Sequence, residues 1–251
     1  EFMIMPVGAN NFSQAMQWAT EIYSDLKKLL QAKCLSTSVG DEGGFAPNLQ
    51  SNQEAIELII QAIRNNNLTE GRDVGIALDC AATEFYNNGI YDLQGESTKL
   101  NSNEFTNYLA ELTKKYPILS IEDGMDESDF DGWKNLTNVL GDSCQLVGDD
   151  LFVTQQKFLE RGIKENVGNS ILIKLNQVGT VSETIDTIKC AQENEFSTII
   201  SHRSGETEDT FIADLCIGTK SDQIKSGAPA RGERVNKYNR LLLIEDHIKG
   251  R

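Results

Sequence analysis

Six short apolar stretches of the sequence each end in an ionisable residue. In chain order, these residues are Asp79, Glu122, Asp149, Lys174, the neighbours His202 and Arg203, and Lys225. Three carboxylates brought together repel one another unless a cation neutralises them, and ligation by oxygen atoms alone suits a hard ion such as Mg²⁺. The lysines and the arginine would add a cationic half to the same site. The pattern therefore predicts a magnesium site that adjoins a site for an anion.

Lys174 is the most unusual of these residues, because it directly follows the pattern of a buried strand in "NSILIKLNQ" (169–177). An ammonium group is costly in such a setting unless it is paired with a carboxylate or has lost its proton. Two interpretations stay open. Lys174 is either a strand-end lysine that reaches solvent or pairs with a carboxylate, or a residue with a chemical task.

Simpler interpretations exist for the other residues as well. Asp79 could be a helix N-cap, His202 a hydrogen-bonded core histidine, and "GDEGG" (40–44) a flexible turn. Alternation along a strand predicts that Asp123 and Asp150, adjacent to the expected ligands, point away from them. What favours chemistry is the conjunction, because independent accidents do not place ionisable residues on six successive strand ends.

The elements that must position these residues alternate between strands and helices. Strands are expected at "VGIAL" (74–78), "ILSI" (118–121), "CQLV" (144–147), "SILI" (170–173), "STIIS" (197–201) and "DQI" (222–224). Apolar residues at three-and-four spacing predict helices at 102–116, 154–165, 180–194 and 208–218. This is the rhythm of parallel βα units, whose strands end at one mouth when they close into a barrel.

The first third of the sequence departs from that rhythm. A strand in 1–8, ended by Pro6 and Gly8, precedes two helices, at 10–33 and 51–64, and the second opens with Ser51 and Glu54 in capping-box spacing. The strand count is then seven, whereas a (β/α)₈ barrel needs eight. The chain also opens within a strand, without an initiating methionine. We therefore expect residues 1–251 to be one α/β barrel domain, incomplete at its N-terminus, that forms the C-terminal part of a longer protein.

Composition excludes several classes of protein. The 251 residues are 39% hydrophobic and 24% charged, which is typical of a globular protein. A net charge of −15 argues against nucleic acid as a partner, and the 5 cysteines form no CxxC pair, which argues against disulfides or structural zinc. No apolar stretch approaches the roughly 20 residues of a membrane span, and no signal peptide is apparent. A cytoplasmic protein is expected.

The motifs that carry these residues resemble the enolase (phosphopyruvate hydratase) family, in its bacterial form. They are "GDEGGFAPN" (40–48), "LDCAATEFY" (78–86), "SIEDGMDESD" (120–129), "VGDDLFVT" (147–154), "ILIKLNQVGT" (171–180), "SHRSGETEDT" (201–210) and "IKSGAPARGERVNKYN" (224–239). The resemblance implies the C-terminal TIM-type barrel of that family, ββαα(βα)₆, without the N-terminal domain and the first barrel strand. It also implies the Mg²⁺-dependent dehydration of 2-phosphoglycerate to phosphoenolpyruvate in glycolysis, by homodimers or assemblies of dimers.

Residue roles follow from the same resemblance, motif by motif. It makes Lys174 the general base and Glu42 the general acid, with Glu1 supporting that acid and His202 nearby. Asp79, Glu122 and Asp149 resemble the magnesium ligands, Arg203 and Ser204 the phosphate-binding pair, and Lys225 a contact to the substrate carboxylate.

Three functional hypotheses remain. The first is an enolase or its barrel portion, although residues 1–251 alone are expected to have negligible activity. The second is a surface-exposed or secreted protein that binds plasminogen, to which Lys249 and Arg251 lend weak support. The third is another enzyme of the enolase superfamily that acts on a different carboxylate. The pairing of "GDEGG" with "SHRSG" favours a phosphorylated substrate and therefore the first hypothesis.

Overall fold

The computed structural model describes residues 1–250, and Arg251, which the sequence suggested for a surface-binding role, lies outside them. The chain divides into two compact units. The first consists of Glu1–Met3, Ile76–Ile199 and Ser221–Gln223, and the second of Ile4–Gly75, Ile200–Lys220 and the chain from Ile224 onward. Within residues 1–250, none of the helices has both the length and the apolar character that crossing a membrane requires.

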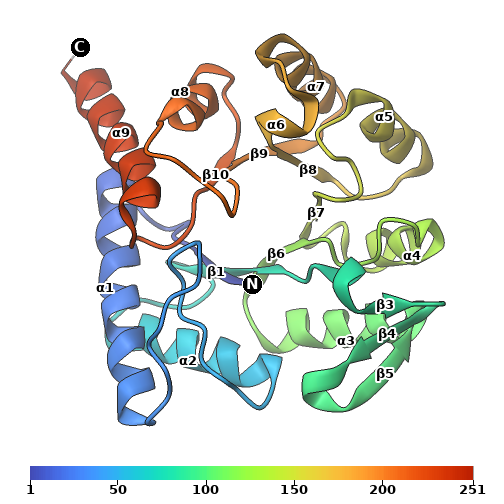
Figure 1. The fold of residues 1–251 in the computed structure, drawn as a ribbon, viewed down its shortest axis with the longest axis horizontal. Helices are drawn as coiled ribbons and strands as arrows, with labels where there is room; N and C mark the ends of the chain where they lie inside the picture. Colours follow the sequence, from blue (N-terminus) through green and yellow to red (C-terminus); the bar gives the residue numbers. More distant parts are fainter. Residues whose placement is uncertain (251) are drawn as a thin grey trace. The chain divides into compact units, whose positions relative to one another are not determined.

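The main sheet has seven strands, which confirms the predicted count (Figure 1). They are β1 (Phe2–Met5), β2 (Gly75–Asp79), β6 (Ile118–Glu122), β7 (Gln145–Gly148), β8 (Ser170–Ile173), β9 (Ser197–Ser201) and β10 (Gln223–Lys225). The strand order is β1-β2-β6-β7-β8-β9-β10, and the pairs β2–β6, β6–β7 and β7–β8 are parallel. The strands of the first unit are buried along most of their length, which explains their nearly continuous apolar sequences.

Helices connect the strands of the main sheet, and most of them were predicted from the sequence. Their bounds are α1 (Phe12–Ala32), α2 (Asn52–Asn65), α3 (Ser102–Lys115), α4 (Phe130–Leu140), α5 (Gln156–Glu165), α6 (Leu175–Val178), α7 (Val181–Glu193), α8 (Phe211–Gly218) and α9 (Gly232–Lys249). Two helices follow β1, as expected. Ser51 caps α2 through its hydroxyl, which accepts from Glu54 N–H, while the Glu54 carboxylate accepts from Gln50 N–H. The expected helices at 102–116, 154–165, 180–194 and 208–218 are confirmed as α3, α5, α7 and α8.

A small antiparallel sheet in the first unit was not expected. It contains β3 (Tyr86–Asn87), β4 (Ile90–Leu93) and β5 (Thr98–Asn101), and two 3₁₀ turns, Ala82–Phe85 and Gln94–Glu96, lie beside its strands. Asn88 and Gly89 form the turn between β3 and β4 with φ of 49° and 84°. An Asn-Gly pair is the usual signal of such a hairpin. The sheet presents the buried Tyr91, whose hydroxyl donates to Asp129 at 2.8 Å.

Helix α4 is a second element that was not predicted from the sequence, and Asp129 is its N-cap. Asp129 lies in the acidic run "DESDFD" (126–131), a composition that is more common on solvated surface. In the structure its carboxylate caps α4 by accepting from Gly132 N–H at 2.9 Å, and it also accepts from Ser102 Oγ at 2.5 Å. Asp126 of the same run is buried. The run is therefore partly buried and caps a helix, while Glu127, Ser128 and Asp131 are exposed.

A glycine–aromatic contact shapes the end of β7. Gly148 is the last residue of β7, and a Cβ added there would lie 2.5 Å from Cδ2 of Phe152. Gly162 on α5 meets the same ring, so that Phe152 fits between two glycines. Val147, Leu172 and Ile199 form a cluster in the core of this unit. The backbone directly before Asp149 is therefore packed tightly against the ring of Phe152.

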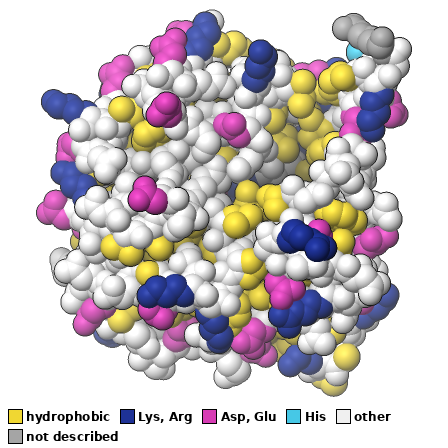
Figure 2. All heavy atoms as spheres, turned by 180° about the vertical axis from the view of Figure 1, so that it is seen from behind, with side chains coloured by type: hydrophobic (Ala, Val, Ile, Leu, Met, Phe, Trp, Pro, Cys, Tyr) yellow, Lys and Arg dark blue, Asp and Glu magenta, His cyan; other side chains and the backbone are white. Residues whose placement is uncertain are grey.

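In the second unit, helices α1 and α9 pack against each other, as do α8 and α9 (Figure 1). Arg240 on α9 makes two hydrogen bonds to Asp214 on α8, at 2.8 and 2.5 Å. On the face of the molecule drawn in Figure 2, basic and acidic side chains are interspersed and do not gather into one basic patch.

Candidate active site

Lys174 is paired with a carboxylate. It follows β8 directly, and its Nζ donates to Oδ2 of Asp149, which follows β7. The two side chains are only 17% and 10% exposed. Gln177 donates from Nε2 to the other Asp149 oxygen at 3.1 Å. The pairing interpretation of Lys174 is therefore confirmed, whereas its role as a base remains a prediction.

Thr154 fixes the geometry around this ion pair. Its hydroxyl accepts from Lys174 N–H at 2.8 Å and donates to Gln177 Oε1 at 2.6 Å. The Gln177 amide consequently presents its oxygen to Thr154 and its nitrogen to Asp149. Thr187 on α7 donates to the Thr154 carbonyl at 3.0 Å, which anchors the segment from a second element. Both Asp149 oxygens are held by side chains with a defined orientation.

The expectation that Asp123 and Asp150 point away from Asp149 is wrong for both residues, since each places a carboxylate oxygen within 4.8 Å of an Asp149 oxygen. Asp123 has a left-handed backbone (φ 42°), which ends the strand alternation on which that expectation rested. Its carboxylate turns toward β7 and accepts from the N–H groups of Asp149 and Asp150 at 2.9 and 3.0 Å. Burial, opposed by these hydrogen bonds and reinforced by the two neighbouring carboxylates, raises the pKa of Asp123 to about 8.

Asp123, Asp149 and Asp150 form what we call the carboxylate cluster, with ligand oxygens that all lie within 4.8 Å of one another. This donor set consists of oxygen atoms alone, two of its residues are buried, and it fits a hard cation such as Mg²⁺. The cluster shares only Asp149 with the ligands expected from the sequence. Asp150 is more exposed, and its pKa is raised, mainly because of partial burial and then because of Asp149.

The two other expected ligands are neighbours at the ends of their strands. Asp79 and Glu122 are register partners in the β2–β6 pair, and Glu122 is buried. Asp79 Oδ1 accepts from Ala81 N–H at 3.0 Å, but Ala81 holds the N-cap position of the 3₁₀ turn that follows, so the simpler interpretation of Asp79 as a helix N-cap is wrong. Glu1 lies beside them, since its carbonyl accepts from Asp79 N–H at 2.9 Å. Ligand roles for Asp79 and Glu122, and the supporting role of Glu1, remain predictions.

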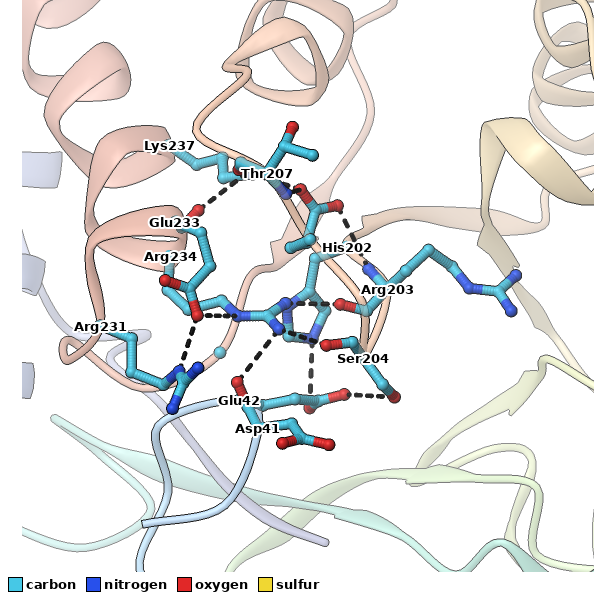
Figure 3. Close-up of polar contacts among 12 residues, drawn as sticks. Asp41, Glu42, His202, Arg203, Ser204, Thr207, Arg231, Glu233, Arg234 and Lys237 are labelled. Atoms are coloured by element: carbon cyan, nitrogen blue, oxygen red, sulfur yellow. Dashed lines mark hydrogen bonds and ion pairs between the residues drawn. The ribbon is translucent and has the colours of Figure 1, made fainter.

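A second group of predicted residues meets within the second unit (Figure 3). His202 follows β9 and is only 2% exposed, and its Nε2 lies 3.2 Å from Glu42 Oε2. Their alignment falls short of a full hydrogen bond. Ser204 Oγ donates to Glu42 Oε1 at 3.3 Å. Lys225, at the end of β10, accepts from His202 N–H through its carbonyl at 2.9 Å. Arg203 donates its N–H to Glu206 Oε1 at 3.4 Å.

These neighbours hold Glu42 in its ionised form. The contact with His202, the charge of Lys225 and the Ser204 hydroxyl outweigh partial burial and lower the pKa of Glu42 to about 2. At neutral pH the group is therefore a carboxylate in this structure. A carboxylate can accept a proton or a hydrogen bond, and it can donate a proton only after its surroundings have changed.

The loop that carries Glu42 is anchored on several sides within its own unit. We call residues 40–45 the Glu42 loop. Tyr23 on α1 donates to Gly43 O at 2.7 Å and stacks on Phe45, with ring centroids 4.4 Å apart. The Glu42 carbonyl accepts from Ala228 N–H at 2.9 Å. Gly43 has φ of 84°, and a Cβ there would lie 2.8 Å from the carbonyl oxygen of Ala230. In this state the loop is packed and is not a free turn.

The sequence alone did not reveal two buried cations, Arg234 and Lys237, on helix α9. Arg234 contacts His202 and three loop carbonyls, and Lys237 donates to Thr207 O at 2.6 Å and pairs with Glu206 at 2.7 Å. The available signal was their spacing, because residues 234, 237 and 241 form the buried stripe of α9. An arginine and a lysine on the buried face of a helix indicate that this face makes hydrogen bonds or ion pairs in the interior.

Parallel strands alternating with helices, with ionisable residues at the strand ends, define an α/β protein of the TIM-barrel class. The model of one family, described as the enolase C-terminal TIM barrel domain, matches residues 1–251. The chain therefore belongs to the enolase C-terminal domain family. The resemblance to the enolase family and the fold class expected from the sequence are confirmed, whereas the bacterial form remains a prediction.

Proposed function

We propose that this chain belongs to an enolase, which dehydrates 2-phospho-D-glycerate to phosphoenolpyruvate in glycolysis and runs in reverse in gluconeogenesis. The observation that carries the proposal is the lysine at the end of β8, held by Asp149 beside a cluster of carboxylates. Abstraction of a proton next to a carboxylate calls for a base near a cation-binding group. Family membership supports the same reaction.

A magnesium ion would be held by Asp149 together with either of two carboxylate sets. The resemblance favours Asp79 and Glu122, and the distances favour Asp123 and Asp150. When bound, the ion would neutralise the second negative charge that develops on the substrate carboxylate.

Lys174 would accept the proton from the carbon next to the carboxylate at Nζ. To do so, Nζ has to be neutral, so the ammonium must first release a proton to solvent and leave Asp149 Oδ2, which it contacts in this structure. Thr154 keeps the backbone of Lys174 in place while the side chain moves, since the 2.8 Å hydrogen bond is to the main-chain N–H. The same movement exposes an Asp149 oxygen to a cation.

Glu42 would supply the proton that leaves with the hydroxide, and for this its pKa must rise from about 2. A phosphorylated substrate supplies the cause, because a phosphate bound by Arg203 and Ser204 brings negative charge close to the Ser204–Glu42 contact. Like charge disfavours the ionised carboxylate. Lys225 would hold the substrate carboxylate, and Glu1 would support Glu42. The proposal thus makes Glu42 an acid only when the substrate is bound.

The test is turnover by the full-length natural protein that carries these residues. With saturating Mg²⁺, we expect 2-phosphoglycerate to give phosphoenolpyruvate, followed by ultraviolet absorbance, and glycerate without the phosphate to give no product. Absence of product from 2-phosphoglycerate would refute the proposal. Turnover of the unphosphorylated acid instead would favour another enzyme of the enolase superfamily.

The surface-binding alternative, capture of plasminogen by a secreted or cell-surface form, gains no further support. Lys249, one of the two basic residues behind it, pairs with Glu245 at 3.2 Å. A cytoplasmic location, homodimers and plasminogen binding remain predictions.

A further inference from the structure

We propose that Arg234 is a positioning residue: its buried guanidinium fixes the tautomer of His202 and joins the Glu42 loop to the loop that follows β9. The consequence for turnover rests on the proposed function. The structural content, a tautomer and a set of hydrogen bonds, is independent of the reaction.

Arg234 lies in the first turn of α9, and its side chain is 1% exposed. Figure 3 shows the guanidinium between the two loops. NH1 contacts His202 Nδ1 at 2.5 Å and donates to Arg203 O at 2.6 Å. NH2 donates to Ser204 O at 2.8 Å and to Asp41 O at 3.1 Å. The nearest carboxylate oxygen, on Glu233, lies 3.9 Å from Nε. Carbonyls and a ring nitrogen therefore provide the direct hydrogen bonds to this buried cation.

The contact with Nδ1 determines the tautomer of His202. A guanidinium offers donors only and stays protonated in proteins, so Nδ1 must accept. A neutral imidazole that accepts at Nδ1 carries its proton on Nε2. Nε2 lies 3.2 Å from Glu42 Oε2, so the proton on Nε2 is beside this carboxylate, although the two groups are not aligned as a full hydrogen bond. The opposite tautomer would turn a lone pair toward Glu42. Through His202, Arg234 thus places an N–H group rather than a lone pair beside the Glu42 carboxylate, which agrees with the lowered pKa of Glu42.

The carbonyl contacts position the two loops relative to each other. Asp41 precedes Glu42, and Ser204 provides the hydroxyl that contacts the Glu42 carboxylate. The planar fork of an arginine can serve both loops and the imidazole at once. A lysine at this position has a single nitrogen at the end of a flexible chain and cannot reproduce the four contacts.

The tautomer can be read directly by nitrogen NMR of the imidazole rings. The sequence has 2 histidines, and His247 is exposed on α9, so the spectrum contains an internal reference. In the unmodified protein we expect a pyridine-type Nδ1 and a pyrrole-type Nε2 for His202. The reverse assignment overturns the proposal without recourse to any variant.

Arg234→Lys tests whether the guanidinium is the cause. We expect His202 in this variant to lose its single tautomer and to show exchange-averaged nitrogen shifts. The matched control is Arg240→Gln on the same helix, whose arginine pairs with Asp214, and it should leave the His202 shifts unchanged. A folded Arg234→Lys protein, judged by circular dichroism, that keeps the native tautomer contradicts the proposal. Millimolar guanidinium added to Arg234→Ala should restore the native shifts.

Turnover separates this inference from the proposed function. In an active full-length enzyme, we expect Arg234→Lys to lower kcat about 10- to 100-fold, the usual cost of losing an outer hydrogen-bond partner. Arg240→Gln should not change kcat. If the unmodified protein shows the expected tautomer but does not act on 2-phosphoglycerate, the proposed function fails and the structural assignment stands. If it is active and Arg234→Lys has the same kcat, Arg234 has no positioning role in the reaction.

Discussion

Asp149 accepts from two side chains at once, Lys174 through Nζ and Gln177 through Nε2, so the ends of β7 and β8 are joined by one carboxylate. This arrangement resolves the puzzle of a lysine behind a buried strand, because the ammonium is paired rather than isolated. A paired ammonium is not yet a base. Under the proposed function the two roles would follow each other in time: Lys174 pairs with Asp149 in the resting protein and would accept the substrate proton only after Nζ has lost one of its own.

Isotope exchange can distinguish the proposed role of Lys174 as the base from that of Glu42 as the acid. In the full-length enzyme, Lys174→Ala should slow the exchange of the substrate α-proton with solvent. The expected decrease in the exchange rate is at least about 10²- to 10⁴-fold, which is typical of the loss of a general base. Glu42→Gln should block dehydration and leave exchange measurable, because the base acts first. Lys164→Ala, at an exposed position on α5, is the control. Equal loss of exchange in both variants would refute the assignment.

Glu42 should also leave a mark on stability. Its folded pKa of about 2 lies below the ordinary value of 4.5, so its contribution is fully present above about pH 4.5 and is lost as the pH falls toward 2. Urea unfolding of the unmodified protein and of Glu42→Gln should therefore differ most at pH 6 and converge near pH 2. Glu208→Gln, at an exposed position, controls for the change in net charge. A difference that grows on acidification would show that the sign is wrong.

Single residues were predictable where the strand pattern was regular and not where the backbone departs from it. Asp149 and Lys174 follow buried strands, so their meeting could be anticipated. Asp123 could not be placed, because its left-handed conformation reverses the direction expected from alternation. Arg234 was missed because its partners are carbonyls and a ring nitrogen, which no charge pattern reveals.

At the scale of elements, strand β7 depends on the fit between Gly148 and Phe152. Gly148→Ala would place a Cβ 2.5 Å from the ring, and the backbone directly before Asp149 would have to move. Overpacking of this kind costs about 1–3 kcal/mol. We expect lower stability in urea together with weaker Mg²⁺ binding. Gly95→Ala is the control, since a Cβ there meets no atom within 4 Å. Unchanged urea stability in Gly148→Ala would contradict this account.

The strands and most helices could be predicted because apolar period and burial agree along the chain. Helix α4 and the sheet of β3, β4 and β5 could not be placed with the same evidence. Helix α4 begins in an acidic run whose Asp129 is a cap, and capping depends on Tyr91 and Ser102 from other elements. The hairpin was signalled by Asn88 and Gly89, but its strands are too short to show a period.

At the scale of the whole molecule, the net charge of −15 means that a bound cation should reduce charge repulsion in the folded state and so stabilise it. A ligand that binds only the folded state stabilises it by about 2.7 kcal/mol at 100 times its Kd. Mg²⁺ should raise the unfolding temperature of the unmodified protein, and Asp149→Asn should remove most of this increment. The rise in unfolding temperature that Mg²⁺ causes has to be compared between the two proteins. The unfolding temperatures themselves are not comparable, because Asp149→Asn also breaks the pair with Lys174. An undiminished increment in Asp149→Asn would exclude Asp149 as a ligand.

The pair between Lys174 and Asp149 gives cation binding a competitive character. An ion that takes Asp149 Oδ2 has to displace an ammonium that already contacts this oxygen, so binding is an exchange of one positive charge for another. The lysine acts as a resident counter-ion that limits repulsion within the carboxylate cluster. Part of the affinity for the metal is spent on displacing it. Lys174→Ala should therefore bind Mg²⁺ more tightly than the unmodified protein does, whatever its effect on turnover.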